Sequence, residues 1–406
     1  MARAGPRVAI AGGSLGGLTA AVLLADRGCD VHVFERSGSE LTGRGVGIVV
    51  HPVTVRYPVE NGGVLLDEIS TAAERWVYLD ASGGVLHAEP CAYRFTAWNT
   101  LYRTLRRCLP EARYHFGRPL LGFDAMATGV RAEFGGGDRI EVDLLVCADG
   151  SHSTGRSILL PGVAPQYSGY VGWRGTVAEA EISSESLAVL AGTISYHIPK
   201  RSHILVYPIP SVDGSVAAGD RLINFVWYRN VARTELEPLM TDRRGEIREL
   251  SVPPGLVATP YVDELRHAAR SLPPPIAEVV LRTEEPFVQQ VVDVQVPRMA
   301  FGRTCLLGDA AFTARPHAAA GTAKAAADAW ALAAAMEQAG GDVEAALARW
   351  EPAQVALGAG LVERSRQMGE RYQVSGDAEP SDPFLRFGLR RPRDSEVVPD
   401  QARSIT

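Results

Sequence analysis

The stretch RVAIAGGSLGGLTAAVLLADRGCDVHVFER, residues 7–36, has the pattern of a strand, a glycine-rich turn, a helix and a second strand. Residues 8–11 and 31–34 are short apolar runs typical of buried strands, and the apolar residues of 18–27 have helical spacing. This order predicts a βαβ unit, the building block of a parallel sheet with helices packed on it.

The predicted turn is rich in glycine, which allows a sharp bend and a close approach of a pyrophosphate to the helix N-terminus. The turn residues are Gly12, Gly13, Ser14, Leu15, Gly16 and Gly17. Ser14 replaces the second glycine of the usual GxGxxG pattern, so Gly13 must supply part of the freedom. Glu35, beside Arg36, lies about 20 residues further on, where an acid binds a ribose hydroxyl. The glycines alone would fit an ordinary tight turn, but with the acid they predict a dinucleotide site.

Length and composition exclude several other classes of protein. The chain has 406 residues, with 46% hydrophobic and 22% charged residues, which is typical of a globular protein of two or three domain cores. Its net charge of −6 argues against binding to nucleic acid, and its apolar runs are too short to cross a membrane. The five scattered cysteines have no metal-binding spacing. We expect a cytoplasmic protein without a metal site.

Two later motifs repeat the design of an apolar strand that ends in an acidic turn. DLLVCADGSHSTGR, residues 143–156, contains Asp149, and RTCLLGD, residues 303–309, ends in Gly308 and Asp309. Each motif alone fits a surface turn. In a parallel sheet, however, ligands lie beyond the carboxyl ends of the strands, so the two turns and the glycine loop are expected to meet at one ligand.

The three motifs in this order, GGSLGG with Glu35, DGSHSTGR and GDAAFTARPHAAAG, resemble the FAD-dependent single-component aromatic hydroxylases of the para-hydroxybenzoate hydroxylase type. The resemblance covers residues 7–335. The sequences YVGWRG at 170–175 and RPHAAAG at 315–321 are most similar to the corresponding segments of the hydroxypyridine hydroxylases.

The resemblance implies a non-covalent FAD and a role for each matching residue. Glu35 would bind the adenosine ribose, Arg44 the pyrophosphate or ribityl region, and Asp309 the ribityl chain. Asp149 would serve both FAD and the nicotinamide donor. The remaining cofactor residues implied are Arg103 near the FAD, and Pro316, Gly321 and Thr322 at the isoalloxazine ring. Trp98 and Phe312 depart from the family, where a polar FAD contact and a histidine are frequent.

The implied fold is α/β, with a Rossmann-like FAD domain and its parallel sheet interrupted by a substrate domain of mostly antiparallel strands, followed by C-terminal helices. We predict an FAD domain from residues 1–75, 95–165 and 290–340, a substrate domain from 76–94 and 166–289, and a C-terminal helix and tail from 341–406. Alternating apolar segments such as HILVYPIP at 203–210 support the antiparallel strands.

The implied reaction is hydroxylation of an electron-rich hydroxylated ring, a hydroxypyridine or a phenol, with NADH or NADPH and O2 through a flavin C4a-hydroperoxide. Ionising a ring hydroxyl needs a proton acceptor with a pKa near the working pH, which favours a histidine. His317 and His51 are the candidates, although either could be structural. Arg315 is a candidate partner for an anionic oxygen or a solvated loop residue. Aromatic and histidine residues of the predicted strands are candidates for the substrate pocket, although they could be plain core: Trp173, Tyr196, His203, Tyr207 and Tyr228.

The sequence argues against one alternative and leaves two others open. A flavin-dependent halogenase needs an early lysine, but the only lysines are Lys200 and Lys324. A flavin-dependent reductase or oxidase would share the FAD motifs, and a non-catalytic nucleotide-binding protein would share the βαβ unit. NADH is favoured over NADPH, and a homo-oligomer is compatible with the sequence.

Overall fold

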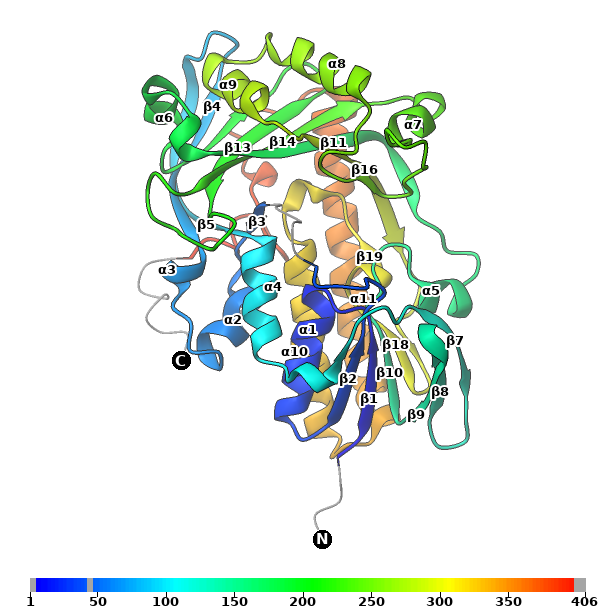
Figure 1. Ribbon diagram of the computed structural model, residues 1–406. Coiled ribbons are helices and arrows are strands. Elements are labelled where there is room, and N and C mark those ends of the chain that lie inside the picture. Colours follow the sequence, from blue (N-terminus) through cyan, green and yellow to red (C-terminus); the bar gives the residue numbers. More distant parts are fainter. Residues whose placement is uncertain (1–4, 42–46, 398–406) are drawn as a thin grey trace.

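A six-stranded sheet forms the lower half of the structure, a computed structural model that describes residues 5–41 and 47–397 (Figure 1). Its strands, in spatial order, are β17 (Ala300–Phe301), β18 (Thr304–Leu306), β10 (Leu144–Cys147), β1 (Arg7–Ala11), β2 (Asp30–Phe34) and β6 (Tyr114–His115). The pairs from β18 to β6 are parallel, and β17 is antiparallel to β18. The carboxyl ends of β1, β10 and β18 therefore meet at one edge, as the three motifs predict.

The predicted βαβ unit is present, and its helix α1 (Leu15–Asp26) begins closer to the glycine turn than its apolar spacing suggests. The helix is buried along most of its length. It lies between the sheet and the alanine-rich helix α10 (Gly321–Gln338), whose small side chains permit close packing (Figure 1). Both helices point their N-termini toward the edge where the strand-end motifs meet.

A larger, mostly antiparallel sheet forms the upper half (Figure 1). In spatial order it contains β15 (Ser251–Val252), β16 (Phe287–Gln295), β11 (Gln166–Ala178), β14 (Leu222–Asn230), β13 (His203–Ile209), β12 (Thr193–His197), β4 (Thr71–Leu79), β5 (Val85–Ala97) and β3 (Gly47–Val49), with β19 (Phe312–Thr313) paired to β16. Helices α8 (Thr259–Ala269) and α9 (Pro274–Arg282) cover its outer face. Its inner face carries a separate apolar core rich in tyrosine.

The remaining elements connect and support these two sheets. A small sheet contains β7 (Leu120–Ala125), β8 (Val130–Phe134) and β9 (Asp138–Val142). The other helices are α2 (Pro52–Glu60), α3 (Leu66–Ile69), α4 (Trp98–Arg107), α5 (Thr154–Leu159), α6 (Ser184–Leu190), α7 (Arg233–Met240) and α11 (Val343–Gly369), which runs between the two halves. Among the described residues, no helix is long and apolar enough to cross a membrane.

The predicted fold class is confirmed: a parallel sheet with packed helices, a mostly antiparallel sheet and C-terminal helices are all present. Three of the predicted domain boundaries fall inside strands, because β4, β5 and β16 run continuously through residues 75–76, 94–95 and 289–290. Composition does not mark the end of a strand that stays in one sheet. The division into an FAD domain and a substrate domain itself stays a prediction.

Candidate functional site

The glycine loop has two positions, Gly12 and Gly17, where a Cβ would clash with backbone. Gly12 has a φ of +99°, and a Cβ there would lie 2.3 Å from the carbonyl oxygen of Ala148, just beyond β10. A Cβ on Gly17 would lie 2.0 Å from the carbonyl oxygen of Gly12. Ser14 caps α1 with extended backbone and no side-chain hydrogen bond. The amides that begin α1 are therefore available to an anion.

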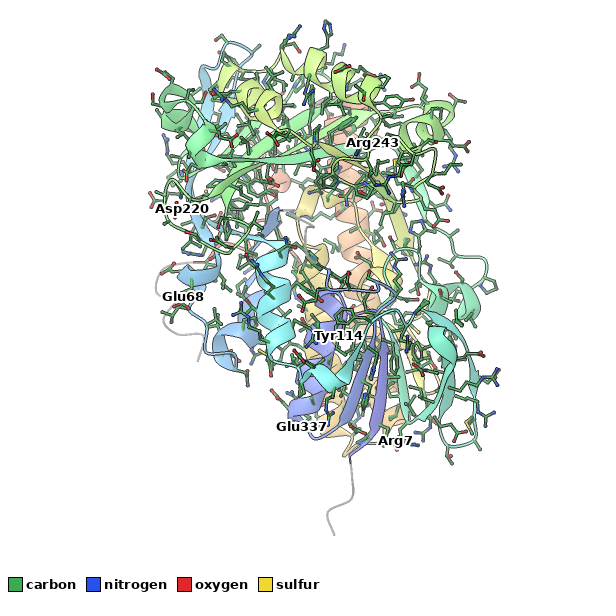
Figure 2. The ribbon with its side chains drawn as sticks, in the orientation of Figure 1. Arg7, Glu68, Tyr114, Asp220, Arg243 and Glu337 are labelled. Carbon is green, nitrogen blue, oxygen red and sulfur yellow. The ribbon has the colours of Figure 1, made fainter. Side chains whose placement is uncertain are left out.

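Tyr114 of β6 supports this loop from the side, which the sequence did not predict. Its hydroxyl donates to the carbonyl oxygen of Gly13 over 3.0 Å and occupies the place that a Cβ on Gly13 would need. Figure 2 shows Tyr114 beside the carboxyl ends of β1 and β2. Burial raises the pKa of Tyr114, so the hydroxyl stays protonated and can donate.

Glu35 follows β2 and lies beside the same loop, as predicted. Its carboxylate is buried and accepts two backbone hydrogen bonds, from Gly13 over 2.8 Å and from Ser37 over 2.9 Å. Two amides thus fix the orientation of the carboxylate next to the glycines. This geometry suits an acid that receives a ribose hydroxyl.

The predicted arginines lie in three different settings. Arg36 is exposed beside Glu35. Arg103, on α4, donates to the carbonyl oxygen of Val212 over 2.7 Å. Arg44 lies outside the described residues. Trp98, at the start of α4, stacks on Tyr102 with ring centroids 4.9 Å apart.

The Asp149 turn is connected to the Asp309 turn through a buried arginine. Asp149 accepts from the hydroxyl of Ser153 and from the amide of Gly155 over 3.2 Å, while burial raises its pKa. The buried guanidinium of Arg156 donates to the carbonyl oxygens of Ser151 and Ala310. The second and third motifs therefore form one rigid edge, which their spacing in the sequence could not reveal.

Asp309 lies in a 3-10 turn, and a buried ion pair holds the residue before it. The amide of Gly308 donates to the carboxylate of Asp328 over 2.9 Å, and Lys324 donates to the same oxygen over 2.6 Å. Both charged side chains are almost fully buried, and the ammonium of Lys324 lies 4.8 Å from the ring centroid of Phe312. Asp309 itself is exposed. Desolvation of its carboxyl group by the surrounding protein nevertheless raises its pKa.

Pro316 and His317 lie in a 3-10 turn that leads into α10. The first amides of α10, from Gly321 and Thr322, have no acceptor within the helix, and Ala320 provides no side-chain cap. The turn ends at Ala319 with a φ of +53°. His51 donates to the carbonyl oxygen of Ala319 over 3.0 Å, and burial lowers its pKa to about 4. This bond gives His51 a structural contact to the turn.

The environment of His317 differs from that expected of a base. Its Nε2 atom lies 2.6 Å from the hydroxyl of Tyr170, and its Nδ1 atom is buried without a partner among the described residues. Burial and the nearby Arg315 lower the pKa of His317 to about 3, not to the working pH that we expected. Arg315 is not solvated either, because it pairs with the buried Asp293 over 2.9 Å.

A cavity of about 150 Å³ lies where these turns face the large sheet. Asp309 and Pro316 border it on one side, and Tyr228 and Arg174 border it on the other. The Nε atom of Arg174 is buried, and the guanidinium has no hydrogen-bond or ion-pair partner in residues 5–41 and 47–397. Burial raises the pKa of Tyr228 to about 12, and the positive charge of Arg174 opposes this rise.

The large sheet divides the predicted pocket residues between its two faces. Tyr196, Tyr207 and Tyr228 belong to the core of the inner face, and His203 stacks on Tyr228. Trp173, by contrast, belongs to the core of the outer face. Successive side chains of a strand point to opposite faces, so the structure does not bring Trp173 to the cavity.

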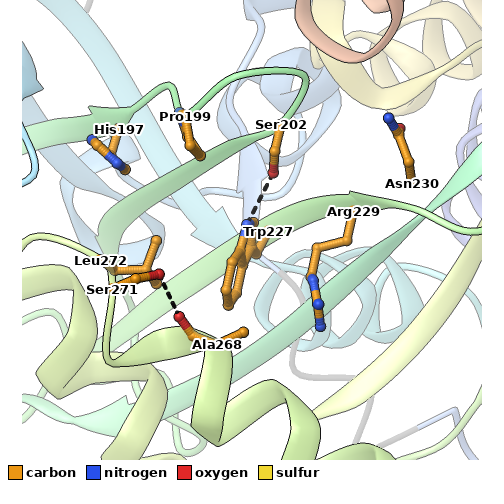
Figure 3. A pocket seen from close by; sticks show the side chains of 9 residues that line it. All are labelled: His197, Pro199, Ser202, Trp227, Arg229, Asn230, Ala268, Ser271 and Leu272. Carbon is orange, nitrogen blue, oxygen red and sulfur yellow. Dashed lines mark hydrogen bonds between the residues drawn. The ribbon is translucent and has the colours of Figure 1, made fainter.

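The outer face has a pocket of its own, of about 230 Å³, beside the end of α8 (Figure 3). Trp227 and Arg229 of β14 lie in it, and Trp227 donates to the hydroxyl of Ser202 over 3.1 Å. This pocket lies on the side of the sheet opposite Asp309 and the glycine loop. It therefore provides control positions for the site on the inner face.

Comparisons with known proteins identify the family. Residues 10–62 match the model of the NAD(P)-binding Rossmann-like domain, and residues 167–293 match that of an FAD binding domain-like family. The 2,6-dihydroxypyridine 3-monooxygenase of Paenarthrobacter nicotinovorans is 38% identical over 394 residues, which cover 97% of this chain and 98% of that protein. The chain belongs to the FAD-dependent single-component aromatic monooxygenases.

Two further comparisons support the assignment of this chain to the monooxygenase family. The solved structure of 2,6-dihydroxypyridine-3-hydroxylase from Arthrobacter nicotinovorans has a TM-score of 0.90 at 37% identity and covers 97% of this chain and 99% of that one. The 3-amino-4-hydroxybenzoate 2-monooxygenase of Streptomyces cremeus is 27% identical over 93% of this chain and 90% of that protein. The predicted family is confirmed, and the monooxygenase reading is favoured over a reductase, an oxidase or a non-catalytic protein.

The described residues fit the cofactor of this monooxygenase. The buried carboxylate of Glu35 after β2, the glycine cradle after β1 and the exposed carboxylate of Asp309 after β18 follow one edge of the sheet, in the order that a dinucleotide with a ribityl chain requires. FAD, NAD(P)H and O2 are the cofactors and co-substrates of the enzyme. It hydroxylates a hydroxylated aromatic or heteroaromatic ring.

Proposed function

We propose that this monooxygenase hydroxylates a small hydroxypyridine, bound as the anion of a ring hydroxyl in the cavity of about 150 Å³. The unpartnered guanidinium of Arg174 beside Tyr228 is the observation that carries this proposal. A volume of about this size is sufficient for a single ring such as benzene. The relatives that act on hydroxypyridines and an aminohydroxybenzoate support the same substrate class.

The bound FAD, once reduced by NAD(P)H, supplies the activated oxygen, and the protein prepares the ring. An ionised ring hydroxyl makes its ortho and para carbons nucleophilic. The cation of Arg174 stabilises this anion, because an opposite charge nearby favours the ionised form. The ring of Tyr228 and the apolar side chains that line the same cavity, such as Leu250, help to exclude water, which protects the oxygen transfer.

The roles of the cofactor residues remain part of the proposal. Glu35 binds the ribose, Asp309 binds the ribityl chain, and Pro316 with the amides of Gly321 and Thr322 faces the isoalloxazine ring. The buried, oriented carboxylate of Glu35 and the exposed carboxylate of Asp309 support these assignments. We also propose that the electron donor is NADH. We propose further that the enzyme acts in the cytoplasm and binds no nucleic acid. A homo-oligomer is compatible with this proposal.

Hydroxypyridines should stimulate NADH oxidation by the purified, FAD-loaded enzyme. In the presence of 18O2, mass spectrometry should show a product that is heavier by one labelled oxygen atom. Pyridine, which has no hydroxyl group to ionise, serves as the control and should give no product. Hydrogen peroxide as the sole oxygen product from every hydroxypyridine and phenol tested would contradict the proposal.

Arg174→Gln should raise the pH at which the enzyme becomes active. Loss of the cation raises the pKa of the bound ring hydroxyl, by about 1–3 units for a neighbouring opposite charge, so the acidic limb of the pH profile of kcat moves upward. Arg174→Lys retains the charge and should preserve most of the profile. Arg229→Gln, on the outer face of the same sheet, is the matched control (Figure 3). An unchanged profile for Arg174→Gln would remove Arg174 from the substrate site.

A further inference from the structure

A side-chain amide without a protein partner borders the cavity of about 150 Å³ in which we place the ring. It belongs to Gln289 of β16, which is half-buried. Within the described part of the chain, its amide makes no hydrogen bond to another residue. A primary amide carries an NH2 donor and a carbonyl acceptor side by side. Gln289 can therefore offer both groups to a ligand in this cavity.

The register of the large sheet places Gln289 on the same face as Arg174. Gln289 pairs with Gly172 of β11, and the next pair along is Trp173 with Val288. Trp173 and Val288 both belong to the core of the outer face, so the pair before them faces the inner side. Arg174 is two residues from Gly172, on the same face and about 7 Å further along the strand.

Gly172 leaves an opening between Gln289 and Tyr228. It pairs with Gln289 on one side and with Tyr228 of β14 on the other. A Cβ at Gly172 would lie 3.3 Å from the Cε1 atom of Tyr228, which is a tight contact. The missing side chain gives a planar ring room beside the backbone, with the amide of Gln289 at one edge and the guanidinium of Arg174 nearby.

The ring edge that matches an amide is a lactam. A pyridine with a hydroxyl group next to its nitrogen adopts the pyridone tautomer, in which a ring N–H donor lies beside an exocyclic oxygen acceptor. One amide pairs with both groups at once. Because no protein partner fixes the amide of Gln289, rotation of its terminal bond can present its oxygen and nitrogen in either order. A phenol has no ring N–H beside its hydroxyl group and leaves one half of the amide unpaired.

We propose that Gln289 is a specificity-determining residue whose amide pairs with the N–H and the neighbouring oxygen of a pyridone ring above Gly172, while a second, ionised ring oxygen faces Arg174. This proposal rests on the proposed function and adds the feature by which the enzyme prefers a hydroxypyridine to a phenol of the same shape. A site that bonds a polar edge rejects an analogue without it, because the polar groups of the site are then left unpaired.

The first experiment compares two rings of one shape, 2,6-dihydroxypyridine and resorcinol, which differ in the ring nitrogen. Their Kd values are measured from changes in the flavin absorption of the FAD-loaded enzyme, without NADH and without oxygen. The wild type should bind the pyridine about 5- to 50-fold more tightly, since resorcinol leaves one half of the amide unpaired. Equal Kd values would overturn the proposal, even if no variant folded.

The second experiment assigns this preference to Gln289. The two probes ionise at different pH values, so the decisive quantity is the change in each Kd, at one pH, between the wild type and Gln289→Met. The variant should lose about 5- to 50-fold more affinity for 2,6-dihydroxypyridine than for resorcinol. Gln166→Met in β11 is the matched control, because this exposed glutamine donates only to the carbonyl oxygen of nearby Ala164, over 3.2 Å. Equal losses for both probes would overturn the proposal.

The neighbouring Gln290 tests the register. It also borders the cavity, but it pairs with Val171, which belongs to the core of the outer face. Gln290→Met should therefore reduce the preference for the pyridine less than Gln289→Met does. The reverse order would overturn the assignment to Gln289.

Turnover with NADH and oxygen separates this proposal from the proposed function. If the wild type bound 2,6-dihydroxypyridine but formed only hydrogen peroxide, the proposed hydroxylation would fail, while the Kd values would still decide the role of Gln289. A hydroxylated product together with a Kd that Gln289→Met leaves unchanged would keep the proposed function and remove Gln289 from it. A wild type that bound neither ring would refute both.

Discussion

Lys324→Met should lower the free energy of unfolding by about 3–5 kcal/mol, the usual cost of leaving one partner of a buried ion pair uncompensated. The ammonium of Lys324 and the carboxylate of Asp328 are almost fully buried and lie 2.6 Å apart. Without the ammonium, burial would favour protonation of Asp328, whose pKa is already raised. The amide of Gly308 would then lose its charged acceptor, and FAD should bind more weakly. Denaturant unfolding of the enzyme with and without FAD measures both effects.

The chain offers a matched control for this prediction. Lys200→Met changes the other lysine of the sequence, which is exposed, and should alter the free energy of unfolding by less than about 0.5 kcal/mol. The double variant Lys324→Met with Asp328→Leu removes both charges and should recover part of the loss. It cannot recover all of it, because the amide of Gly308 stays without its acceptor. If Lys324→Met were as stable as Lys200→Met, the buried ion pair would not contribute to the free energy of unfolding.

Gly12→Ala should leave the purified protein nearly free of FAD. Alanine at a φ of +99° strains the backbone by about 1–3 kcal/mol, and its Cβ would lie 2.3 Å from the carbonyl oxygen of Ala148. Relief of the clash must move the loop or the end of β10, both of which we place at the cofactor. Each 1.4 kcal/mol weakens binding tenfold, so about a 10- to 100-fold rise in the Kd for FAD is expected.

The absorption spectrum of the purified protein and a flavin titration of its apo form test this prediction. Gly38→Ala, also near the end of β2, is the control, since a Cβ there meets no atom within 4 Å and should leave FAD binding unchanged. An unaltered Kd for Gly12→Ala would mean that the loop does not hold the pyrophosphate.

The fold could be predicted largely from the sequence because its signals are local. The βαβ unit follows from adjacent residues, and the strands that precede Asp149 and Asp309 are short apolar runs with an acidic end. Their meeting at one edge follows from the geometry of a parallel sheet. It was harder to predict from the sequence to which face of the large sheet a residue points. Trp173 has the composition of a pocket residue, but the phase of β11 places it on the outer face.

The supporting residues of the site could not be predicted, since their contacts join distant parts of the chain. Arg156 reaches Ala310, and Tyr114 reaches Gly13. Nor does a sequence report desolvation, which gives His317 a pKa of about 3 instead of the near-neutral value of a free imidazole. In each case the partner, and not the residue itself, determines the chemistry.

The burial of Lys324 also has a practical consequence for labelling the enzyme. The sequence contains two lysines, and an amine-reactive dye cannot reach the one that is sealed against Asp328. Lys200, in the exposed loop between β12 and β13, is then the one accessible lysine. Once the terminal amine is blocked, a fluorophore or surface linker would attach at one place. The native protein thus offers a site-specific handle far along the chain from the glycine loop, without an engineered residue.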